Sequence, residues 1–297
     1  MQITPLSETH AAEVTGIDLK AKFDPATVEK LNKALVRHIA LVFRDQVLSP
    51  PEYAEAVQIF GPLKVERYKS EFGISESPHV IEVSNQARDD KGNRIKHGRV
   101  WHTDDADEID PPNYTVLYAL EVPESGGATG ILNTRDGYES LPVEMRRQLD
   151  TMRVVPLRTG GRARLAEASK AFIFDEKTRF EEGNHHPLVR THPEAGTKAI
   201  YFHGVKTDRV EGLTPDETRD VLLDILDRLE NSKFLYKHQW RKGDLLIWDN
   251  RSALHQAYFD YPETATRLLH KTILKGTRPY GPAMPLSEFD ETGNVSA

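Results

Sequence analysis

Apolar positions recur along the chain at two spacings, which predict three helices and a larger number of strands. Residues 24–38 place apolar side chains on one helical face, behind an aspartate N-cap and a proline at the first helical position. Residues 49–61 open with a Ser-Pro-Pro-Glu capping box and predict a second helix. Residues 214–229 open with Thr-Pro-Asp-Glu and carry an apolar stripe, which predicts a third.

Short apolar or alternating segments, separated by turns that contain glycine or proline, dominate the chain from residue 114 onward. Many short strands with a few covering helices are typical of a mainly β (α+β) fold with a sandwich or jelly-roll core. The predicted strands are residues 39–43, 79–84, 114–121, 128–132, 153–157, 187–191, 198–202, 234–240, 244–248, 254–259 and 267–274.

The 297 residues contain no internal repeat, low-complexity tract or evident linker, and we expect one domain over residues 1–297. Residues 159–185 fit neither the helical nor the strand spacing, and they mix basic with acidic side chains. A loop of this length inside a compact domain is usually functional, so we predict a lid. An exposed excursion with a short helix is the alternative.

The composition argues against several classes of protein. Cysteine is absent, which removes disulfides, thiolate zinc sites, iron–sulfur clusters and cysteine nucleophiles, so any metal must be held by His, Asp or Glu. Lys and Arg number 39 against 46 Asp and Glu, a net charge of −7, which argues against nucleic-acid binding through a general basic field. The first residues lack a signal-peptide pattern, and no apolar run approaches the length of a membrane span. We therefore expect a cytoplasmic protein that binds neither nucleic acid nor membranes.

Three residues have the chemistry and the setting of metal ligands. His102 and Asp104 are two apart in an extended segment, so their side chains point to the same face. His255 follows an apolar strand and a polar turn, and would complete a set of two histidines and one carboxylate. Three protein ligands leave coordination positions open, which suits non-haem iron(II), whereas a structural metal site tends to be closed. Taken singly, an exposed strand end and a core histidine explain the same residues.

A carboxylate-binding pair is the next feature. Arg267 lies twelve residues after His255 in an alternating segment and offers a bidentate fork for a carboxylate. Thr129 follows a Gly-Gly turn, and its hydroxyl could contact the same carboxylate. Taken singly, a surface ion pair explains Arg267 and an ordinary turn residue explains Thr129.

In combination, these residues resemble the taurine dioxygenase / 2,4-dichlorophenoxyacetate dioxygenase family of iron(II)- and 2-oxoglutarate-dependent oxygenases. The resemblance rests on the order His102-x-Asp104, Thr129, Trp248-Asp249-Asn250-Arg251-x₃-His255 and Arg267. It extends to flanking segments at residues 14–19, 60–63, 122–129, 138–141, 187–193 and 210–213.

The resemblance implies a double-stranded β-helix, a relative of the jelly roll. It implies that His102, Asp104 and His255 hold iron(II), and that Arg267 and Thr129 hold the distal carboxylate of 2-oxoglutarate, with O₂ as second cosubstrate. The expected reaction hydroxylates a small organic acid or zwitterion and releases succinate and CO₂. Cleavage follows where the hydroxylated carbon also bears a sulfonate or ether oxygen.

The chain departs from the family at the expected substrate contacts. In members that cleave sulfonates or aryloxyacetates, a second arginine four residues after the 2-oxoglutarate arginine binds the substrate anion; here that residue is Lys271. Asp105 and Asp107 follow the metal motif where the family often has apolar contacts. We predict that Lys271 contacts the substrate in place of that arginine, and that Asp105 and Asp107 accept a positive or zwitterionic group of the substrate. A solvated edge is the alternative for the acids, and a lysine reaching solvent for Lys271.

Two other functions use the same residues. A zinc hydrolase would employ the three ligands with a metal-bound water, and Asp105 is its candidate general base. A non-catalytic jelly-roll binding module is the second alternative. The expected partner is a small-molecule substrate, and we expect a homo-oligomer, either a dimer or a tetramer.

Overall fold

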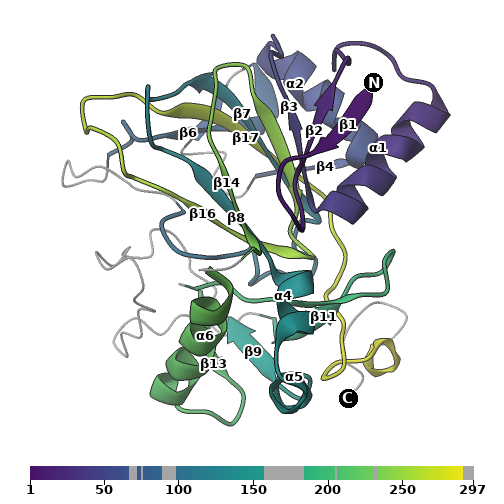
Figure 1. Ribbon diagram of the computed structural model, residues 1–297, viewed down its shortest axis with the longest axis vertical. Helices are drawn as coiled ribbons and strands as arrows, with labels where there is room; N and C mark the ends of the chain where they lie inside the picture. The colour runs from purple at the N-terminus through teal and green to yellow at the C-terminus, as the bar shows by residue number, and fades with distance from the viewer. Residues whose placement is uncertain are drawn as a thin grey trace.

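The computed structural model places two facing β-sheets above a second group of helices and short strands (Figure 1). It describes residues 1–66, 72–74, 76–88, 98–156, 184–204, 206–230 and 233–289. Within this described part, no helix is both long and apolar enough to cross a membrane.

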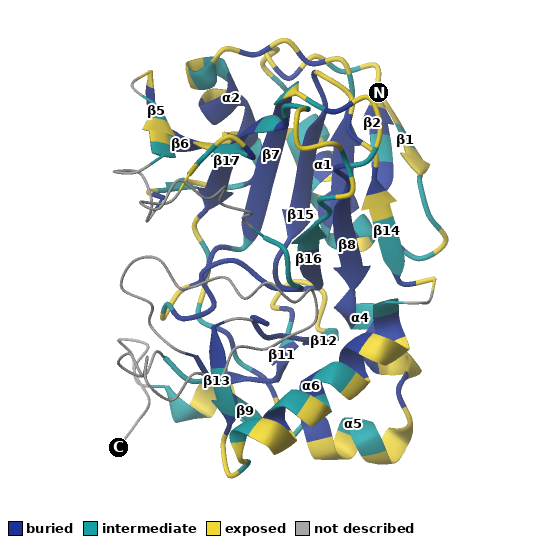
Figure 2. Cartoon of the chain, turned by 90° about the vertical axis from the view of Figure 1, so that its left-hand side faces the viewer, coloured by how far each residue is buried: buried dark blue, intermediate teal, exposed yellow. Residues whose placement is uncertain are grey.

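The larger sheet has nine strands within the described residues, in the order β1-β2-β3-β15-β7-β17-β6-β5, with β4 paired to β17. Its central strands are buried along almost their whole length (Figure 2). Only β2 and β3 pair in parallel among these neighbours. The strands are β1 (Gln2–Pro5), β2 (Ala12–Thr15), β3 (Ala40–Phe43), β4 (Leu63–Lys64), β5 (Gly73–Ile74), β6 (Ser77–Ser84), β7 (Tyr114–Glu121), β15 (Leu245–Asp249) and β17 (Leu268–Leu274).

Two helices cover the outer face of the larger sheet. They are α1 (Pro25–His38) and α2 (Pro50–Ala56), the latter followed by a 3-10 turn, η1 (Val57–Phe60). The predicted caps are present: the Asp24 side chain accepts the Thr27 N–H, and Ser49 forms a capping box with Glu52. Apolar side chains of both helices pack on one face of β7 and β15, which explains the helical stripe in the sequence; among them are Leu31, Leu35, Tyr53, Val116, Tyr118 and Ile247.

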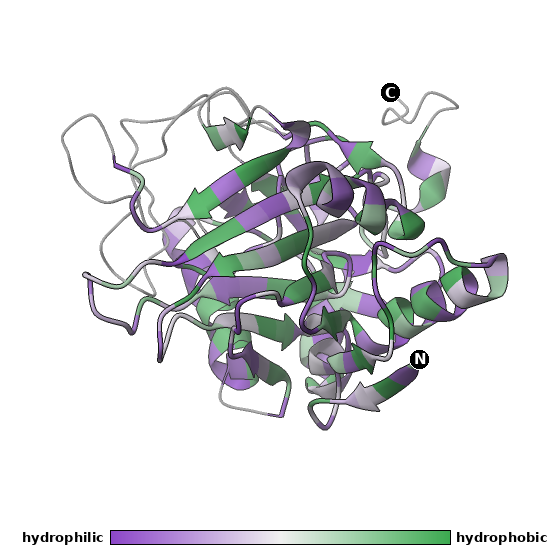
Figure 3. Ribbon diagram, turned by 90° about the horizontal axis from the view of Figure 1, so that it is seen from above, coloured by the Kyte–Doolittle hydropathy of each residue, from purple (hydrophilic) through white to green (hydrophobic). Residues whose placement is uncertain are grey.

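The inner face of the larger sheet packs against a three-stranded sheet, in the order β14-β8-β16. Its strands are β8 (Thr129–Asn133), β14 (Leu235–His238) and β16 (Ala253–Ala257). The core between the sheets takes the alternate residues of β7, β15 and β17, including Leu117, Leu246, Trp248 and Leu269, together with Ile131 and Ala253 of the small sheet. Seen from above, the strands carry alternating hydrophobic and hydrophilic bands (Figure 3).

The second group of elements lies at the other end of the molecule (Figures 1 and 2). Its core joins the apolar stripe of α6 to the small sheet through Leu222, Ile225 and Leu229 with Leu132 and Leu254. The elements are α4 (Thr134–Ser140), α5 (Val143–Leu149), β9 (Arg153–Pro156), β10 (His186–Pro187), β11 (Val189–Thr191), β12 (Lys198–Ile200), β13 (Thr207–Val210), α6 (Pro215–Glu230) and η3 (Leu286–Glu288).

The three predicted helices and the predicted strands are confirmed, with ends that shift by at most two residues, except that α2 ends at Ala56 and the 3-10 helix η1 continues the predicted helix to Phe60. The segment 187–191 is two strands rather than one, because β10 pairs with β9 and β11 pairs with β12. The spacing of apolar residues did not predict β1, β2, β4, β5, β13, α4, α5 or η3. The predicted lid lies outside the described residues except for 184 and 185, and it stays a prediction.

Candidate active site

The backbone brings His102 and His255 side by side. His102 N–H donates to the His255 carbonyl at 3.1 Å, and His255 N–H donates to the His102 carbonyl at 2.8 Å. His255 lies in β16, opposite Ile131 of β8, so the small sheet fixes its position. The ring centroids of the two histidines are 4.0 Å apart. The polar turn between β15 and β16 therefore delivers His255 to the segment that carries His102.

Asp104 completes the cluster that the sequence predicts. Its Oδ1 lies 3.9 Å from His102 Nε2, and its Oδ2 lies 3.9 Å from His255 Nε2. One ligand atom of each residue lies within 4.8 Å of the others, and all three residues are buried. A solvated strand end and an isolated core histidine are therefore wrong interpretations of these residues.

The protonation states of the three side chains suit a divalent metal. His102 Nδ1 lies 2.7 Å from the Val100 carbonyl, which only accepts, so this nitrogen carries the proton and Nε2 is left as a ligand atom. Burial lowers the pKa of both His102 and His255, which keeps them neutral. Burial opposes ionisation of Asp104, but the charge of Lys271 and the hydrogen bond from Thr115 outweigh it and hold the pKa of the carboxyl well below its usual range. Two neutral imidazoles and one carboxylate fit non-haem iron(II) with open positions.

Both oxygens of Asp104 also have partners outside the cluster. Thr115 Oγ1 in β7 donates to Asp104 Oδ2 at 2.5 Å. Lys271 Nζ in β17 lies 3.3 Å from Asp104 Oδ1. The carboxylate is thus held between the inner face of the larger sheet and the two histidines.

Arg267 and Thr129 are brought together as predicted. Arg267 Nη2 donates to Thr129 Oγ1 at 3.1 Å, and its Nε donates to the Gly127 carbonyl at 2.9 Å. Arg267 is only 4 % exposed, so a surface ion pair is the wrong interpretation. Among the described residues no carboxylate forms an ion pair with it; burial lowers its pKa to about 10, and the group stays charged at neutral pH. A buried charge without a counter-ion is costly, so Arg267 is a candidate for binding an anion.

Lys271 is turned into the protein rather than out to solvent. Its side chain is 17 % exposed and forms ion pairs with Asp104 and with Glu66, whose Oε1 lies 3.5 Å from Nζ. Burial raises the pKa of Glu66 to about 7, although Lys271 opposes that shift. Sequence reasoning missed Glu66, because an acid that follows Lys-Val in a charged segment has the signature of a surface residue.

Asp105 and Asp107 are buried, so the solvated edge is also wrong. Asp107 Oδ1 lies 3.2 Å from Lys206 Nζ, and the Asp107 side chain has no exposed surface. Asp105 adopts a positive φ of 45°, a conformation in which short polar side chains are enriched. A substrate cation at Asp107 would have to replace Lys206 as its partner.

A fourth histidine beside the cluster was not predicted. His203 forms a backbone bridge with His102, and their ring centroids are 4.9 Å apart. Its Nδ1 accepts the Lys206 N–H at 3.1 Å, which places the ring proton on Nε2. Burial lowers the pKa of His203 well below its ordinary value, so the ring is neutral. A single histidine after an apolar strand carries no distinguishing signal in the sequence.

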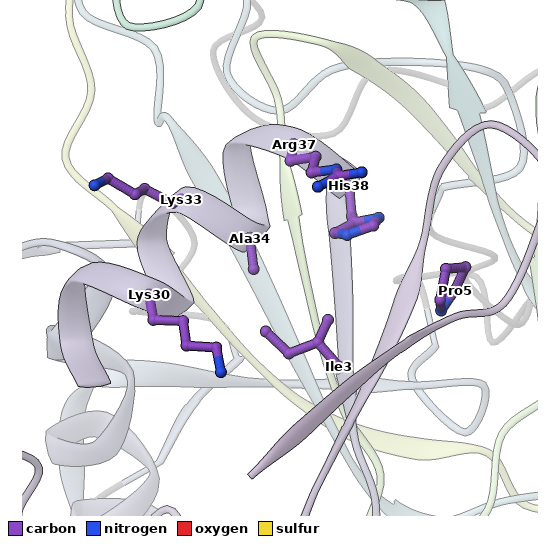
Figure 4. Close-up of a pocket in the computed structure, with 7 residues that line it drawn as sticks. All are labelled: Ile3, Pro5, Lys30, Lys33, Ala34, Arg37 and His38. Atoms are coloured by element: carbon purple, nitrogen blue, oxygen red, sulfur yellow. The ribbon is translucent and has the colours of Figure 1, made fainter. Parts of the chain in front are cut away.

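A surface pocket lies elsewhere, between α1 and β1 (Figure 4). None of the predicted site residues lines it. Its basic side chains come from one face and the end of α1, and its lining residues are Ile3, Pro5, Lys30, Lys33, Ala34, Arg37 and His38.

The family model described as taurine catabolism dioxygenase TauD, TfdA family matches residues 2–273. The chain belongs to this family. It is 31 % identical over 264 residues to an alpha-ketoglutarate-dependent 2,4-dichlorophenoxyacetate dioxygenase of Cupriavidus pinatubonensis, covering 85 % of this chain and 90 % of that protein. It is 30 % identical to an alkylsulfatase of Acinetobacter baylyi, covering 93 % and 85 %. A taurine dioxygenase from Burkholderia xenovorans superimposes with a TM-score of 0.78 at 29 % identity, covering 95 % of this chain and 92 % of that one.

The TauD/TfdA relationship confirms the predicted fold and class. The protein has the jelly-roll fold of these dioxygenases. It is a 2-oxoglutarate-dependent non-haem iron dioxygenase, with iron(II), 2-oxoglutarate and O₂ as its metal and cosubstrates. A zinc hydrolase would leave the buried charge of Arg267 unexplained, and a non-catalytic module would need neither the intact triad nor Arg267.

Proposed function

We propose that this dioxygenase oxidises a small organic acid or zwitterion, and that five residues bind its metal and cosubstrate. His102, Asp104 and His255 hold iron(II), and Arg267 with Thr129 holds the distal carboxylate of 2-oxoglutarate. The observation that carries the proposal is a buried arginine without a carboxylate partner among the described residues, in the same fold as a buried two-histidine, one-carboxylate cluster. The first feature calls for an anion and the second for a metal with open positions.

The protein's own contribution is to prepare both sites. When bound, iron(II) supplies the redox chemistry by which O₂ and 2-oxoglutarate oxidise the substrate, with succinate and CO₂ as the other products. Burial leaves the side chains of His102, Asp104 and His255 only 9–12 % exposed, which limits the water that reaches their ligand atoms. Arg267 orients the cosubstrate through a fixed guanidinium that the Gly127 carbonyl and the Thr129 hydroxyl hold in place.

The substrate side is proposed to include Lys271, Asp105 and Asp107. Lys271 offers the positive charge for a substrate anion, and the names of the two relatives above refer to a chlorophenoxyacetate and an alkyl sulfate, both anionic. Glu66 forms an ion pair with Lys271 and partly neutralises its charge. A zwitterion would place its anion at Lys271 and its cation toward Glu66 and Asp105.

A substrate screen tests the proposal. The full-length protein with iron(II), ascorbate, 2-oxoglutarate and oxygen is offered small carboxylates, sulfonates, sulfate esters and amino acids, and succinate release is measured. We expect release above the background of the His102→Ala variant for at least one acidic or zwitterionic compound. Stimulation only by neutral or purely cationic compounds would contradict the proposed substrate class. Cosubstrate-dependent release that persists in His102→Ala would contradict the proposed ligands.

Three further proposals concern the whole protein. We propose that residues 1–297 act as one domain, since β8 and β16 contribute side chains to two of the three cores. We propose a homo-oligomer, a dimer or a tetramer, in the cytoplasm. Light scattering after size-exclusion chromatography measures the mass in solution, and a monomer would overturn the oligomer.

A further inference from the structure

A chain of buried hydrogen bonds ends on the carboxylate of Asp104. Trp248 Nε1 donates to Asn250 Oδ1 at 3.1 Å. Asn250 Nδ2 donates to Thr115 Oγ1 at 2.9 Å, and Thr115 Oγ1 donates to Asp104 Oδ2 at 2.5 Å. Trp248, Asn250 and Thr115 are each at most 1 % exposed, so water does not compete for these bonds.

The chemistry of the groups fixes the direction of every bond in this chain. An indole N–H only donates, so the Asn250 side-chain oxygen must face Trp248 and its NH₂ group must face Thr115. The Thr115 hydroxyl therefore accepts from Asn250, and its single proton is left for Asp104. All the donors point toward the carboxylate, and a hydrogen bond to an ionised oxygen is stronger than one between neutral groups.

The backbone fixes the two middle members of this chain, Asn250 and Thr115. Asn250 N–H donates to the Asn113 carbonyl at 2.8 Å, and Asn250 Nδ2 also lies 3.3 Å from the Pro112 carbonyl. Thr115 lies within β7, where it pairs with Trp248 of β15 and Ile273 of β17. The turn that follows β15 thus serves two purposes: it leads to His255, and it supports Asp104 through Thr115.

We infer that Thr115 and Asn250 are positioning residues for the metal centre, which set the rotation of the Asp104 carboxylate before metal binds. The inference rests on the proposed role of Asp104 as a metal ligand. The Thr115 hydroxyl uses one lone pair of Asp104 Oδ2, and the other lone pairs of the carboxylate stay available to the metal. Loss of a hydrogen-bond partner of a metal ligand typically lowers metal affinity 10- to 100-fold.

Metal binding without turnover gives the direct test. We expect Thr115→Val, which keeps the shape and removes the hydroxyl, to raise the Kd for Co(II) at least about tenfold and to change the ligand-field absorption of the bound cobalt. Thr115→Ser should restore both within about threefold, since it keeps the donor. The matched control is Thr218→Val in α6, a buried threonine whose hydroxyl accepts the Val210 N–H and not a hydrogen bond from a triad residue. We expect its cobalt Kd and spectrum to match those of the unmodified protein.

The remaining outcomes separate this inference from the proposed function. If Asp104→Ala binds cobalt as the unmodified protein does, the proposed metal ligands are wrong. If Asp104→Ala loses binding but folded Thr115→Val keeps it, only the positioning role is wrong. Should Thr115→Val fail to fold, Asn250→Leu tests the same chain one step earlier. It removes the donor to Thr115, so the Thr115 hydroxyl loses the bond that fixes its direction. Unchanged cobalt affinity and spectrum in folded Asn250→Leu would overturn the inference.

Discussion

At the scale of single residues, the buried guanidinium of Arg267 limits the possible functions more than any other group at the site. It is buried, charged and bonded only to neutral oxygens among the described residues. A buried carboxylate that loses its charged partner costs about 2–5 kcal/mol. We therefore expect Arg267→Leu to weaken 2-oxoglutarate binding at least tenfold. The measurement is a titration of the anaerobic iron(II)-loaded protein with 2-oxoglutarate, followed by the absorption band of the complex. Its midpoint reports the affinity for 2-oxoglutarate.

The control for this variant is Arg135→Leu. Arg135 also donates to backbone carbonyls, those of Val36 and Arg37, but it lies at α4. We expect its 2-oxoglutarate midpoint to match that of the unmodified protein. An unchanged midpoint in Arg267→Leu would remove Arg267 from the cosubstrate site.

Lys271 is predicted to act on the substrate rather than on 2-oxoglutarate. It lies on β17, four residues after Arg267, and its ammonium group is paired with Asp104 and Glu66. Lys271→Met should raise the KM for an anionic substrate at saturating iron and leave 2-oxoglutarate affinity within about twofold, because only the substrate loses binding energy. Lys275→Met, an exposed lysine just after the same strand, should change neither constant. A collapse of 2-oxoglutarate affinity in Lys271→Met would mean that the two basic residues have been assigned the wrong roles.

At the scale of secondary-structure elements, the sequence predicted those elements whose side chains alternate or recur without interruption. The helix α1 matches because one of its faces packs in a continuous core, and the strand β7 matches because both of its faces are buried, each in a different core. The helix α4 was missed because its N-cap, Asn133, is also the last residue of β8, so no turn separates strand from helix. The boundary between β10 and β11 was missed because it depends on which strands they pair with, and the tertiary structure rather than local spacing determines that pairing.

In the candidate site, too, the residues with a local pattern in the sequence could be predicted, whereas those placed by tertiary packing could not. His102, Asp104 and His255 could be found because ligand spacing and residue type survive in the sequence. Glu66 and His203 could not, because each is brought to the site only by tertiary packing and has no local signature. The hydrogen bonds from Trp248 to Asp104 likewise form only because β15 pairs with β7, which the sequence does not show.

The junction between β8 and α4 gives a prediction at this scale. The buried Asn133 side chain accepts the Asp136 N–H at 3.0 Å and caps the helix. Replacing an asparagine N-cap by alanine costs about 1 kcal/mol, so Asn133→Ala should lower the free energy of unfolding in urea by about that amount. Asn133→Ser keeps an uncharged side-chain acceptor for the first turn of α4 and should lose less. As a control, Glu139→Ala replaces an exposed residue at the other end of α4, and its free energy of unfolding should stay within about 0.5 kcal/mol of the unmodified protein. If Glu139→Ala lost as much stability as Asn133→Ala, the helix cap would not be the cause.

The triad lies where two cores meet. Trp101, next to His102, packs in the core of α6, whereas Ala253 and Leu254 of β16 face different cores on the way to His255. Backbone hydrogen bonds between His102 and His255 join the two regions. A metal held by both histidines and Asp104 would therefore connect the facing sheets to the second group of elements.

Metal binding should in consequence stabilise the whole protein rather than one loop. A ligand that binds only the folded state at 100 times its Kd adds about 2.7 kcal/mol to the free energy of unfolding. We expect Co(II) at that concentration to produce this increase in urea unfolding, and a chelator to reverse it. Asp104→Ala should show no increase at the same cobalt concentration, whereas Asp136→Ala, a half-exposed carboxylate of α4, should respond as the unmodified protein does. If Co(II) raised the free energy of unfolding of Asp104→Ala as much as that of the unmodified protein, the metal would bind elsewhere. The stabilisation would then not depend on the carboxylate that is proposed to hold the metal.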